Sequence, residues 1–399
     1  MRKKIIKFTD YSLKSFIKFI NKIIWQKAGK YFLNKNQIIP QFYFKDVQDF
    51  KTNYKGNYNY TKIDNEKKII PSPVKSLNKD LYNNFQQKEF IYPEDFVLEV
   101  NDGKVYGESG LIITPDNHIL DNINLLHGHI GGIKTNEIFS RFKMPKVKLL
   151  KGNIAVISSL FSNFYYHWML DILPKFKMIE KTGLNIDYYL ISTQNLKFQK
   201  TTLKMLNIPE EKIIILEKNS YFQAENLIIP SMPGNTGYDP QWAIDFVKDL
   251  FLDKNKEGNY PERIYTNRKN AFSRRFVNEK EVKEILNKYN FAEVFLDELS
   301  IEEQASIFYN AKIIFSPHGG ALTNLIFSKQ ESKLIEIFSP SMPIPCYWTL
   351  ANMMKMDYYH IMADCPVNTI KTPNGKYTNQ DIIADLEILE NTIKLAIQD

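Results

Sequence analysis

The sequence is short of cysteines, of long apolar runs and of targeting signals. Only two cysteines occur, Cys346 and Cys365, and their spacing fits neither a disulfide framework nor a metal site. A reducing compartment is the expectation for such a chain, so we predict a cytoplasmic location. No stretch approaches the roughly 18–20 apolar residues of a membrane span. The N-terminus has a basic start but neither the apolar core nor the small-residue cleavage site of a signal peptide.

Two familiar nucleotide-binding motifs are also missing. No predicted strand is followed by G-x-G-x-x-G, which argues against an oxidoreductase or epimerase that uses a dinucleotide. No glycine-rich loop ends in Gly-Lys-Ser/Thr, so a Walker-type phosphate loop is excluded as well.

Positive charge is concentrated at one end of the chain. Residues 1–30 carry nine Lys or Arg and one Asp, a net charge of +8, which leaves −1 for the rest of a chain whose total is +7. A near-neutral body is not expected to bind nucleic acid. Leu13, Phe16, Ile17, Ile20 and Ile24 recur at helical spacing. This basic amphipathic helix either binds the inner face of the membrane peripherally or packs on the body with a solvated lysine face.

Composition divides the chain into four parts. Residues 1–90 are predicted to be the basic helix followed by an irregular arm rich in Asn, Lys and Tyr. Strands with intervening helices make 91–232 a first domain. The Pro- and Gly-rich segment 230–240 is the clearest linker, and Asp239 before Pro240 is a plausible helix start. Residues 239–365 form a second domain, and 378–399 a C-terminal helix.

The second domain alternates between strands and helices. Strands are predicted at 263–266, 292–296, 313–315, 333–338 and 357–362. Two helices are expected to begin at capping pairs, Asn278 with Glu281 and Ser300 with Glu303. Such alternation predicts an α/β fold with a parallel sheet covered by helices on both faces. Ligands of these sheets bind beyond the carboxyl ends of the strands.

The stretch from Ala311 to Ser328 is predicted to be strand, tight turn and short helix. Its turn is Pro317-His318-Gly319-Gly320, followed by Ala321. Glycines let the backbone turn and approach a ligand closely, and the helix start presents free N–H groups suited to phosphate. The alternative is a strand-to-helix connection with incidental glycines.

A second stretch places polar residues on an apolar helix. His167, Asp171 and Lys175 are spaced four residues apart and fall on one face. Pro174 is expected to kink or end this helix. This stripe of polar residues lines a cleft in one interpretation, with Asp171 or His167 accepting a proton. In the other, His167 and Asp171 only bond each other and have a structural role. A separate pair, His127 and His129, has the spacing of metal ligands but no third ligand near it, so no metal site is predicted.

Several charged and polar side chains of the second domain come directly after its predicted strands. Arginines match phosphate bidentately, and a carboxylate such as Glu298 suits sugar hydroxyls. The edge of the sheet where these strands end therefore has groups for both the phosphates and the sugar of a sugar nucleotide. The predicted donor-binding residues are Asn267, Arg268, Arg274, Arg275, Glu298, Gln304, His318, Gly319, Gly320, Ala321, Thr323 and Asn324.

Five pieces of the chain then occur in a recognisable order. They are Tyr166-His167-Trp168-x-x-Asp171-x-x-Pro174; Arg263-Ile264-Tyr265-x-x-Arg268 with Ala271-x-x-Arg274-Arg275 and Asn278-Glu279; Leu299-Ser300-x-x-Glu303-Gln304; His318-Gly319-x-x-Leu322-Thr323-Asn324 with Phe327; and Ile335-Glu336. Together they resemble the catalytic region of glycosyltransferase family 61. One departure is visible, because the family usually has His-Gly-Ala-Gly where this chain has His318-Gly319-Gly320-Ala321.

The resemblance implies two facing Rossmann-like domains, the B-type glycosyltransferase architecture. It implies inverting hexosyl or pentosyl transfer from a nucleoside diphosphate sugar, UDP-linked, to a glycan acceptor, usually without a metal or another cofactor. Bacterial relatives are linked to capsule or other surface polysaccharide. Asp171 is then the first candidate for the base and His167 the second. The alternative is a membrane-associated scaffold protein of a polysaccharide assembly complex with a degenerate site.

Overall fold

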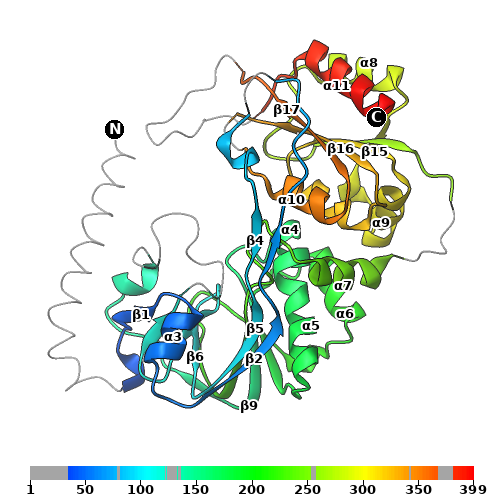
Figure 1. Ribbon diagram of the computed structural model, residues 1–399. Coiled ribbons are helices and arrows are strands. Elements are labelled where there is room, and N and C mark those ends of the chain that lie inside the picture. The colour runs from blue at the N-terminus through cyan, green and yellow to red at the C-terminus, as the bar shows by residue number, and fades with distance from the viewer. Residues whose placement is uncertain are drawn as a thin grey trace, which may run out of the picture. The chain divides into compact units, whose positions relative to one another are not determined.

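The computed structural model describes residues 35–78, 81–121, 123, 133, 136–252, 258–340, 343–366 and 381–399. The chain divides into two compact units (Figure 1): unit 1 is Met1–Asn65 with Glu94–Pro233, and unit 2 is Glu66–Pro93 with Gly234–Asp399. The division after Pro233 falls inside the segment 230–240. The helix predicted for residues 1–30 and the His127-Gly128-His129 loop lie outside the described residues.

Unit 1 combines a large sheet with a few helices. Its elements are η2 Lys35–Gln37, β1 Phe42–Phe44, α3 Val47–Asn53, β2 Tyr58–Asp64, β5 Asp95–Asn101, β6 Lys104–Tyr106, β7 Leu111–Ile113, β8 His118–Leu120, η5 Glu137–Ser140, β9 Lys148–Ile157, α4 Tyr165–His167, η6 Trp168–Ile172, α5 Leu173–Thr182, β10 Tyr188–Ile191, α6 Lys197–Met205, η7 Glu210–Lys212, β11 Ile213–Ile215 and β12 Tyr221–Pro230. Strands with intervening helices occur in residues 91–232, as the sequence predicts.

The sheet of unit 1 is mixed. Strands β12, β9, β10 and β11 pair in parallel in that order, whereas β5 and β6 run antiparallel to β12. Read from β11, the parallel part has the strand order 3-2-1-4, which is found in one half of a doubly wound fold. The end of β9, Ile154–Ile157, is buried throughout, as expected for a parallel strand with both faces covered.

The prediction of an irregular arm up to residue 90 is wrong for the described part. Strand β2 pairs antiparallel with β5, and helix α3 packs against β1. Aromatic residues supply the apolar contacts that the Asn- and Lys-rich composition conceals: Phe44, Phe50 and Tyr54 lie in the core, with Tyr58 and Tyr60 packed against it. The polar residues between them face outward, so average composition hides the pattern.

Unit 2 is built on a parallel sheet. Its elements are β3 Lys67–Ile69, η3 Asn83–Phe85, β4 Phe90–Tyr92, α7 Gln241–Phe251, β13 Arg263–Thr266, α8 Glu279–Lys288, β14 Ala292–Val294, η8 Leu296–Glu298, α9 Ile301–Asn310, β15 Ile313–Pro317, η9 Gly320–Phe327, β16 Lys333–Phe338, α10 Cys346–Met353, β17 Asp357–Met362 and α11 Leu386–Gln398. The order β14-β13-β15-β16-β17, all parallel, is a doubly wound arrangement whose switch point lies between β13 and β15.

Alternate residues of these strands face opposite sides of the sheet. Tyr265, Phe315, Ile335 and Tyr359 face α8 and α11, which lie side by side over that face in Figure 1. The other face is covered by α9, η9 and α10. The α/β fold with a parallel sheet is thereby confirmed.

The predicted helix starts are only partly correct. Ser300 and Glu303 form the expected capping box at α9. Asn278 stands at the N-cap of α8, but its side chain bonds Ala384 in the C-terminal segment and caps nothing. Helix α7 has Pro240 at its N-cap, and α11 is capped by Asp385 instead of starting near residue 380. A side chain that could cap its own helix can instead bond a residue distant in the sequence, and the spacing of residues does not reveal that distant partner.

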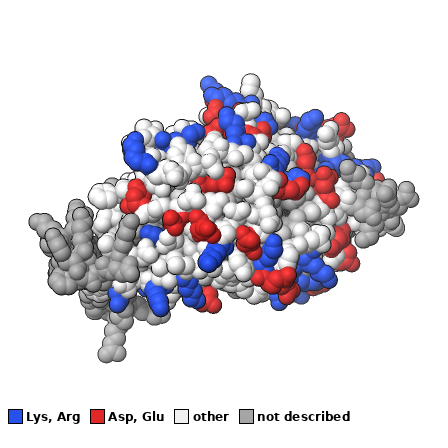
Figure 2. All heavy atoms as spheres, turned by 90° about the horizontal axis from the view of Figure 1, so that it is seen from below, with Lys and Arg blue, Asp and Glu red and all other residues white. Residues whose placement is uncertain are grey.

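Acidic and basic side chains are intermingled on the face shown in Figure 2, where neither sign gathers into a continuous patch. This agrees with the near-neutral body calculated from the sequence. In the described ranges, no helix has both the length and the apolar character needed to cross a membrane.

Candidate active site

The helix that carries His167 and Asp171 is irregular at its centre. It begins as α4, continues through five residues of π-helix in η6 and resumes as α5. Pro174 lies at the start of α5, and its missing N–H and bulky ring disturb the hydrogen bonds of the preceding turn. Single-turn π segments are frequent at functional sites. Pro174 therefore interrupts the α-helix without ending it.

His167 and Asp171 form a close pair on this helix. His167 Nδ1 lies 2.6 Å from Asp171 Oδ2, and the Asp171 side chain is fully buried whereas that of His167 is 19% exposed. Phe161 stacks on the imidazole at 5.1 Å between ring centroids. With Nδ1–H held by the carboxylate, Nε2 carries the lone pair that can accept a proton.

Lys175 continues the predicted stripe into the interior. It is wholly buried, and its Nζ donates to the carbonyl oxygen of Ser158 at 3.1 Å. Burial lowers the pKa of Lys175 to about 8, while the charge of Asp171 acts in the opposite direction. The stripe thus lies on one side of the helix, but only His167 is accessible to a substrate.

The central turn of unit 2 follows β15 as predicted, although its short helix is the 3-10 helix η9. A Cβ on residue 319 would lie 2.0 Å from Nη1 of Arg268, whereas a Cβ on residue 320 would meet nothing within 4 Å. Gly319 is extended, with φ 166°. A side chain at 319 would therefore push the Arg268 guanidinium out of its observed position, whereas one at 320 would not.

Arg268 and Arg274 place two cations close together. Nε and Nη2 of Arg268 donate to the carbonyl oxygen of Ser273 at 3.3 and 3.2 Å. Burial, with a smaller contribution from Arg274, lowers the pKa of Arg268 to about 10. Arg274 has a left-handed backbone, φ 62°, and burial lowers its pKa too. The two guanidinium groups repel each other and have lost part of their hydration, so an anion bound between them would stabilise their charged forms.

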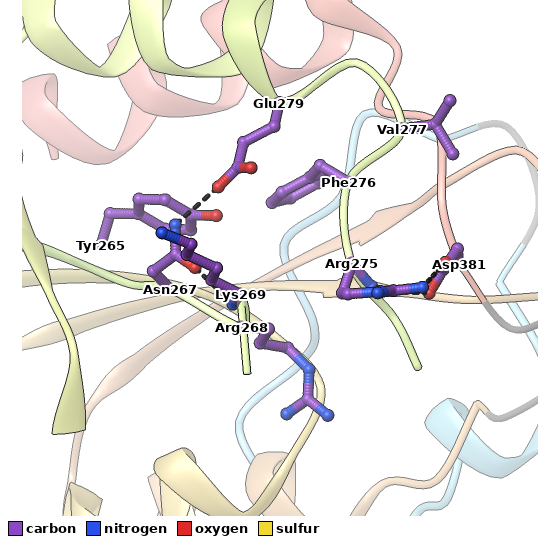
Figure 3. Close-up of a pocket in the computed structure, with 9 residues that line it drawn as sticks. All are labelled: Tyr265, Asn267, Arg268, Lys269, Arg275, Phe276, Val277, Glu279 and Asp381. Carbon is purple, nitrogen blue, oxygen red and sulfur yellow. Dashed lines mark hydrogen bonds and ion pairs between the residues drawn. The ribbon is translucent and has the colours of Figure 1, made fainter. Parts of the chain in front are cut away.

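A pocket of about 350 Å³ opens beside Arg268 at the end of β13 (Figure 3). Three predicted residues line it, Asn267, Arg268 and Arg275; the other lining residues are Tyr265, Lys269, Phe276, Val277, Glu279 and Asp381. Arg275 is paired with Asp381, Nη2 to Oδ2 at 2.9 Å. Asn267 donates to Glu279 at 2.6 Å, so its amide is engaged by the protein itself.

Other predicted donor residues lie away from this pocket. Glu298 is exposed at the end of η8. Gln304 donates to the carbonyl oxygens of Leu296 and Leu299 and accepts from Asn324 at 2.8 Å. Gln304 and Asn324 therefore brace η8, α9 and η9. Thr323 is buried beside the Tyr347 hydroxyl, and Ala321 lies in the first turn of η9.

Three acidic residues of this region were not assigned from the sequence. Glu279 and Glu336 lie in the ordered pieces, but nothing in their spacing reveals a role. Asp381 follows β17 by nineteen positions and gives no local signal. Glu336 accepts from His318 Nδ1 at 2.6 Å and from the Tyr358 hydroxyl at 2.7 Å, which shows that the predicted His318 has a buried carboxylate partner.

The family model described as Glycosyltransferase 61 matches residues 165–335. Over these residues the chain belongs to glycosyltransferase family 61. No curated protein matches the chain. The match begins two residues before His167 and ends at Ile335, so it contains the His–Asp pair, both partly buried arginines and the central turn.

Membership of glycosyltransferase family 61 gives the chain a donor, an acceptor and a transfer reaction in general terms. A transferase of this kind must bind an activated sugar, take a proton from the acceptor and stabilise a leaving group. The two sets of residues described above have the chemistry for these tasks. The altered glycine order in the turn leaves Gly319, which touches Arg268, in the family position.

Proposed function

We propose that this glycosyltransferase moves a UDP-linked sugar to a hydroxyl of a glycan acceptor with inversion at the anomeric carbon, in the synthesis of a surface polysaccharide. Binding of the donor by unit 2 is supported by one observation: Arg268 contacts Gly319 at the switch point of the unit 2 sheet. Open α/β sheets bind ligands at that edge. The facing B-type arrangement implied by the resemblance stays a prediction.

The donor diphosphate is assigned to the arginines and the central turn. Arg268 offers a charge that no described carboxylate within ion-pair distance neutralises, whereas Arg275 is held by Asp381. The first N–H groups of a helix have no partner inside it and suit phosphate oxygens. Charge that develops on the leaving diphosphate is then met by cations already in place.

His167 is our choice for the base, with Asp171 as the group that orients it. This reverses the order suggested by the sequence, because Asp171 is fully buried and its Oδ2 already accepts from His167. Nε2 of His167 would take the proton of the acceptor hydroxyl as that oxygen attacks the anomeric carbon. The carboxylate stabilises the imidazolium that forms, as in other acid–imidazole pairs.

Two further proposals come from the sequence and the resemblance. Transfer is proposed to need no metal, so activity should persist in excess chelator. The protein is proposed to work in the cytoplasm, with residues 1–30 binding the inner face of the membrane. Co-sedimentation with anionic vesicles, compared with a chain lacking these residues, tests that contact.

The decisive experiment is a screen of UDP-sugars for UDP release in the presence of crude glycan acceptors. One donor should give acceptor-dependent release that His167→Ala abolishes. A thermal-shift series with UDP accompanies the screen, since a ligand of the folded state raises the melting temperature. A shift without release from any donor would favour the scaffold function instead. No shift and no release would remove the donor assignment.

A further inference from the structure

A buried chain of three polar side chains runs behind the central turn. His318 Nδ1 lies 2.6 Å from Glu336 Oε1, and the Tyr358 hydroxyl donates to Glu336 Oε2 at 2.7 Å. The Glu336 side chain is fully buried and that of His318 is 6% exposed. Both carboxylate oxygens are therefore occupied, in a site that water does not reach.

The register of the sheet explains this arrangement. Glu336 on β16 and Tyr358 on β17 both point to the face covered by η9 and α10, and His318 follows β15, the other neighbour of β16. Phe338 stacks on the imidazole at 5.0 Å, and Tyr347 closes the other side at 5.3 Å. The ring is thus fixed with Nδ1–H toward Glu336, and Nε2, on the opposite edge, remains as the nitrogen that can meet a ligand.

The charged and titratable groups around the pair come from several elements. Arg274 of the loop after β13 faces Glu336, and Tyr347 and Cys346 come from α10. Arg268 lies against the neighbouring Gly319. His360 on β17 is separated from His318 by Phe338, which stacks on both rings.

Two opposing effects act on the carboxylate. Burial raises the pKa of Glu336, whereas the hydrogen bonds from His318 and Tyr358 and the charge of Arg274 lower it. Burial has the larger effect, so the pKa of Glu336 lies above its ordinary value. The geometry nevertheless matches the carboxylate form, because Oε1 and Oε2 both accept a hydrogen bond, one from His318 and one from Tyr358. An ionised carboxylate favours the protonated form of an imidazole bonded to it.

We propose that Glu336 and Tyr358 are positioning residues that make His318 take up a proton at Nε2 when a diphosphate binds, so that the ring becomes a cationic donor to the leaving group. The proton comes from solvent and stays on Nε2 while the phosphate oxygen accepts from it. This inference rests on the proposed function, because it assigns the anion at the central turn to a nucleoside diphosphate.

Ligand-free protein tests the positioning part without any nucleotide. The chain has only six histidines, so imidazole ¹⁵N spectra of selectively labelled protein are tractable, with His318→Gln assigning the signal. In the wild type we expect the neutral ring to carry its proton on Nδ1, which faces Glu336 Oε1. Glu336→Gln should abolish the preference for that tautomer, because the amide can accept or donate at the position that the carboxylate oxygen holds.

Calorimetry with UDP tests the proton uptake. Titrations in buffers of different ionisation enthalpy should show uptake of about one proton on UDP binding at mildly alkaline pH, where an ordinary imidazole is neutral. Glu336→Gln should remove most of that uptake and weaken UDP binding about tenfold, the scale of one charged hydrogen bond. Tyr358→Phe deletes a single hydroxyl and should reduce both effects in the same direction. Glu284→Gln, an exposed glutamate on α8, is the matched control and should change neither.

The outcomes separate the two proposals. If wild-type protein does not bind UDP, the proposed function fails, and the spectra still report whether Glu336 sets the tautomer. If UDP binds but His318 keeps its tautomer and its proton uptake in both Glu336→Gln and Tyr358→Phe, the positioning role is wrong. Should Glu336→Gln fail to fold, the spectra and uptake of Tyr358→Phe alone decide.

Discussion

Within the described part of the chain, two histidine–carboxylate pairs have the same length but lie in different surroundings. In each, Nδ1 lies 2.6 Å from a fully buried carboxylate. His167 is the more exposed, stacks on Phe161 and shares a helix with the buried Lys175. His318 is nearly enclosed, and its partner Glu336 also accepts from Tyr358 and faces Arg274.

The comparison teaches that the pair by itself does not specify the chemistry. An accessible Nε2 beside an orienting carboxylate suits a base that must receive a proton from an acceptor. An imidazole beside arginines and a glycine turn suits a donor to an anion. The same two residue types thus support opposite proton roles, and the neighbouring groups decide between them.

The largest expected effect comes from breaking the first pair. Asp171→Asn should lower the turnover number by about 10²–10⁴-fold, because the amide cannot hold the imidazole in the same tautomer or stabilise its cation. UDP affinity should stay within about twofold, since the pair is proposed to act on the acceptor hydroxyl and not to bind the diphosphate. Steady-state rates and calorimetry measure the two quantities. Near-normal turnover in the variant would exclude Asp171 from catalysis.

Removing Arg268, the cation beside the His318–Glu336 pair, should weaken the binding of UDP. Arg268→Ala is expected to weaken UDP affinity by about 10–100-fold, as one or two charged hydrogen bonds to phosphate are lost. Arg263→Ala, whose Nη1 donates to the Tyr289 carbonyl at the amino end of β13, serves as the control in calorimetry. Equal affinity for UDP in wild type and Arg268→Ala would remove that residue from the donor site.

The two glycines of the turn give a matched pair of smaller changes. Gly319→Ala should displace the Arg268 guanidinium and weaken UDP binding about tenfold, because its Cβ would lie 2.0 Å from Nη1. Gly320→Ala meets nothing within 4 Å and should leave the affinity unchanged. Similar losses for both substitutions would show that the contact with Arg268 does not determine binding.

The smallest expected effect is a pH dependence of the free energy of unfolding, which arises from Lys175 on the helix of the His167–Asp171 pair. The pKa of Lys175 is about 8 in the folded protein and 10.5 in its ordinary state. The unfolded chain therefore binds more protons between these values, and the free energy of unfolding should rise with pH there, by about 1 kcal/mol between pH 8 and 9. Urea unfolding of wild type and Lys175→Met compares the slopes. A slope that survives in Lys175→Met arises elsewhere.

Sequence patterns predicted the strands of unit 2 because each is a short apolar run bounded by turn residues. They also placed Arg268 and Gly319 at one sheet edge, since both follow parallel strands. They did not foresee that Gln304 and Asn324 bond each other or that Glu298 is exposed, because family motifs do not distinguish bracing residues from binding ones. Tyr358 and Asp381 were missed since their roles depend on sheet order and on a distant segment.

The excursion of residues 66–93 into unit 2 has a practical meaning. The backbone of Lys75 accepts from His360 N–H and donates to the Tyr358 carbonyl, which seals the outer edge of β17. Ser76 and Asn78 engage the next groups along that strand. A fragment starting at Gly234 would expose this edge and invite intermolecular strand pairing. Anyone seeking the nucleotide-binding half in isolation should therefore supply the earlier segment too, either fused or as a separate peptide.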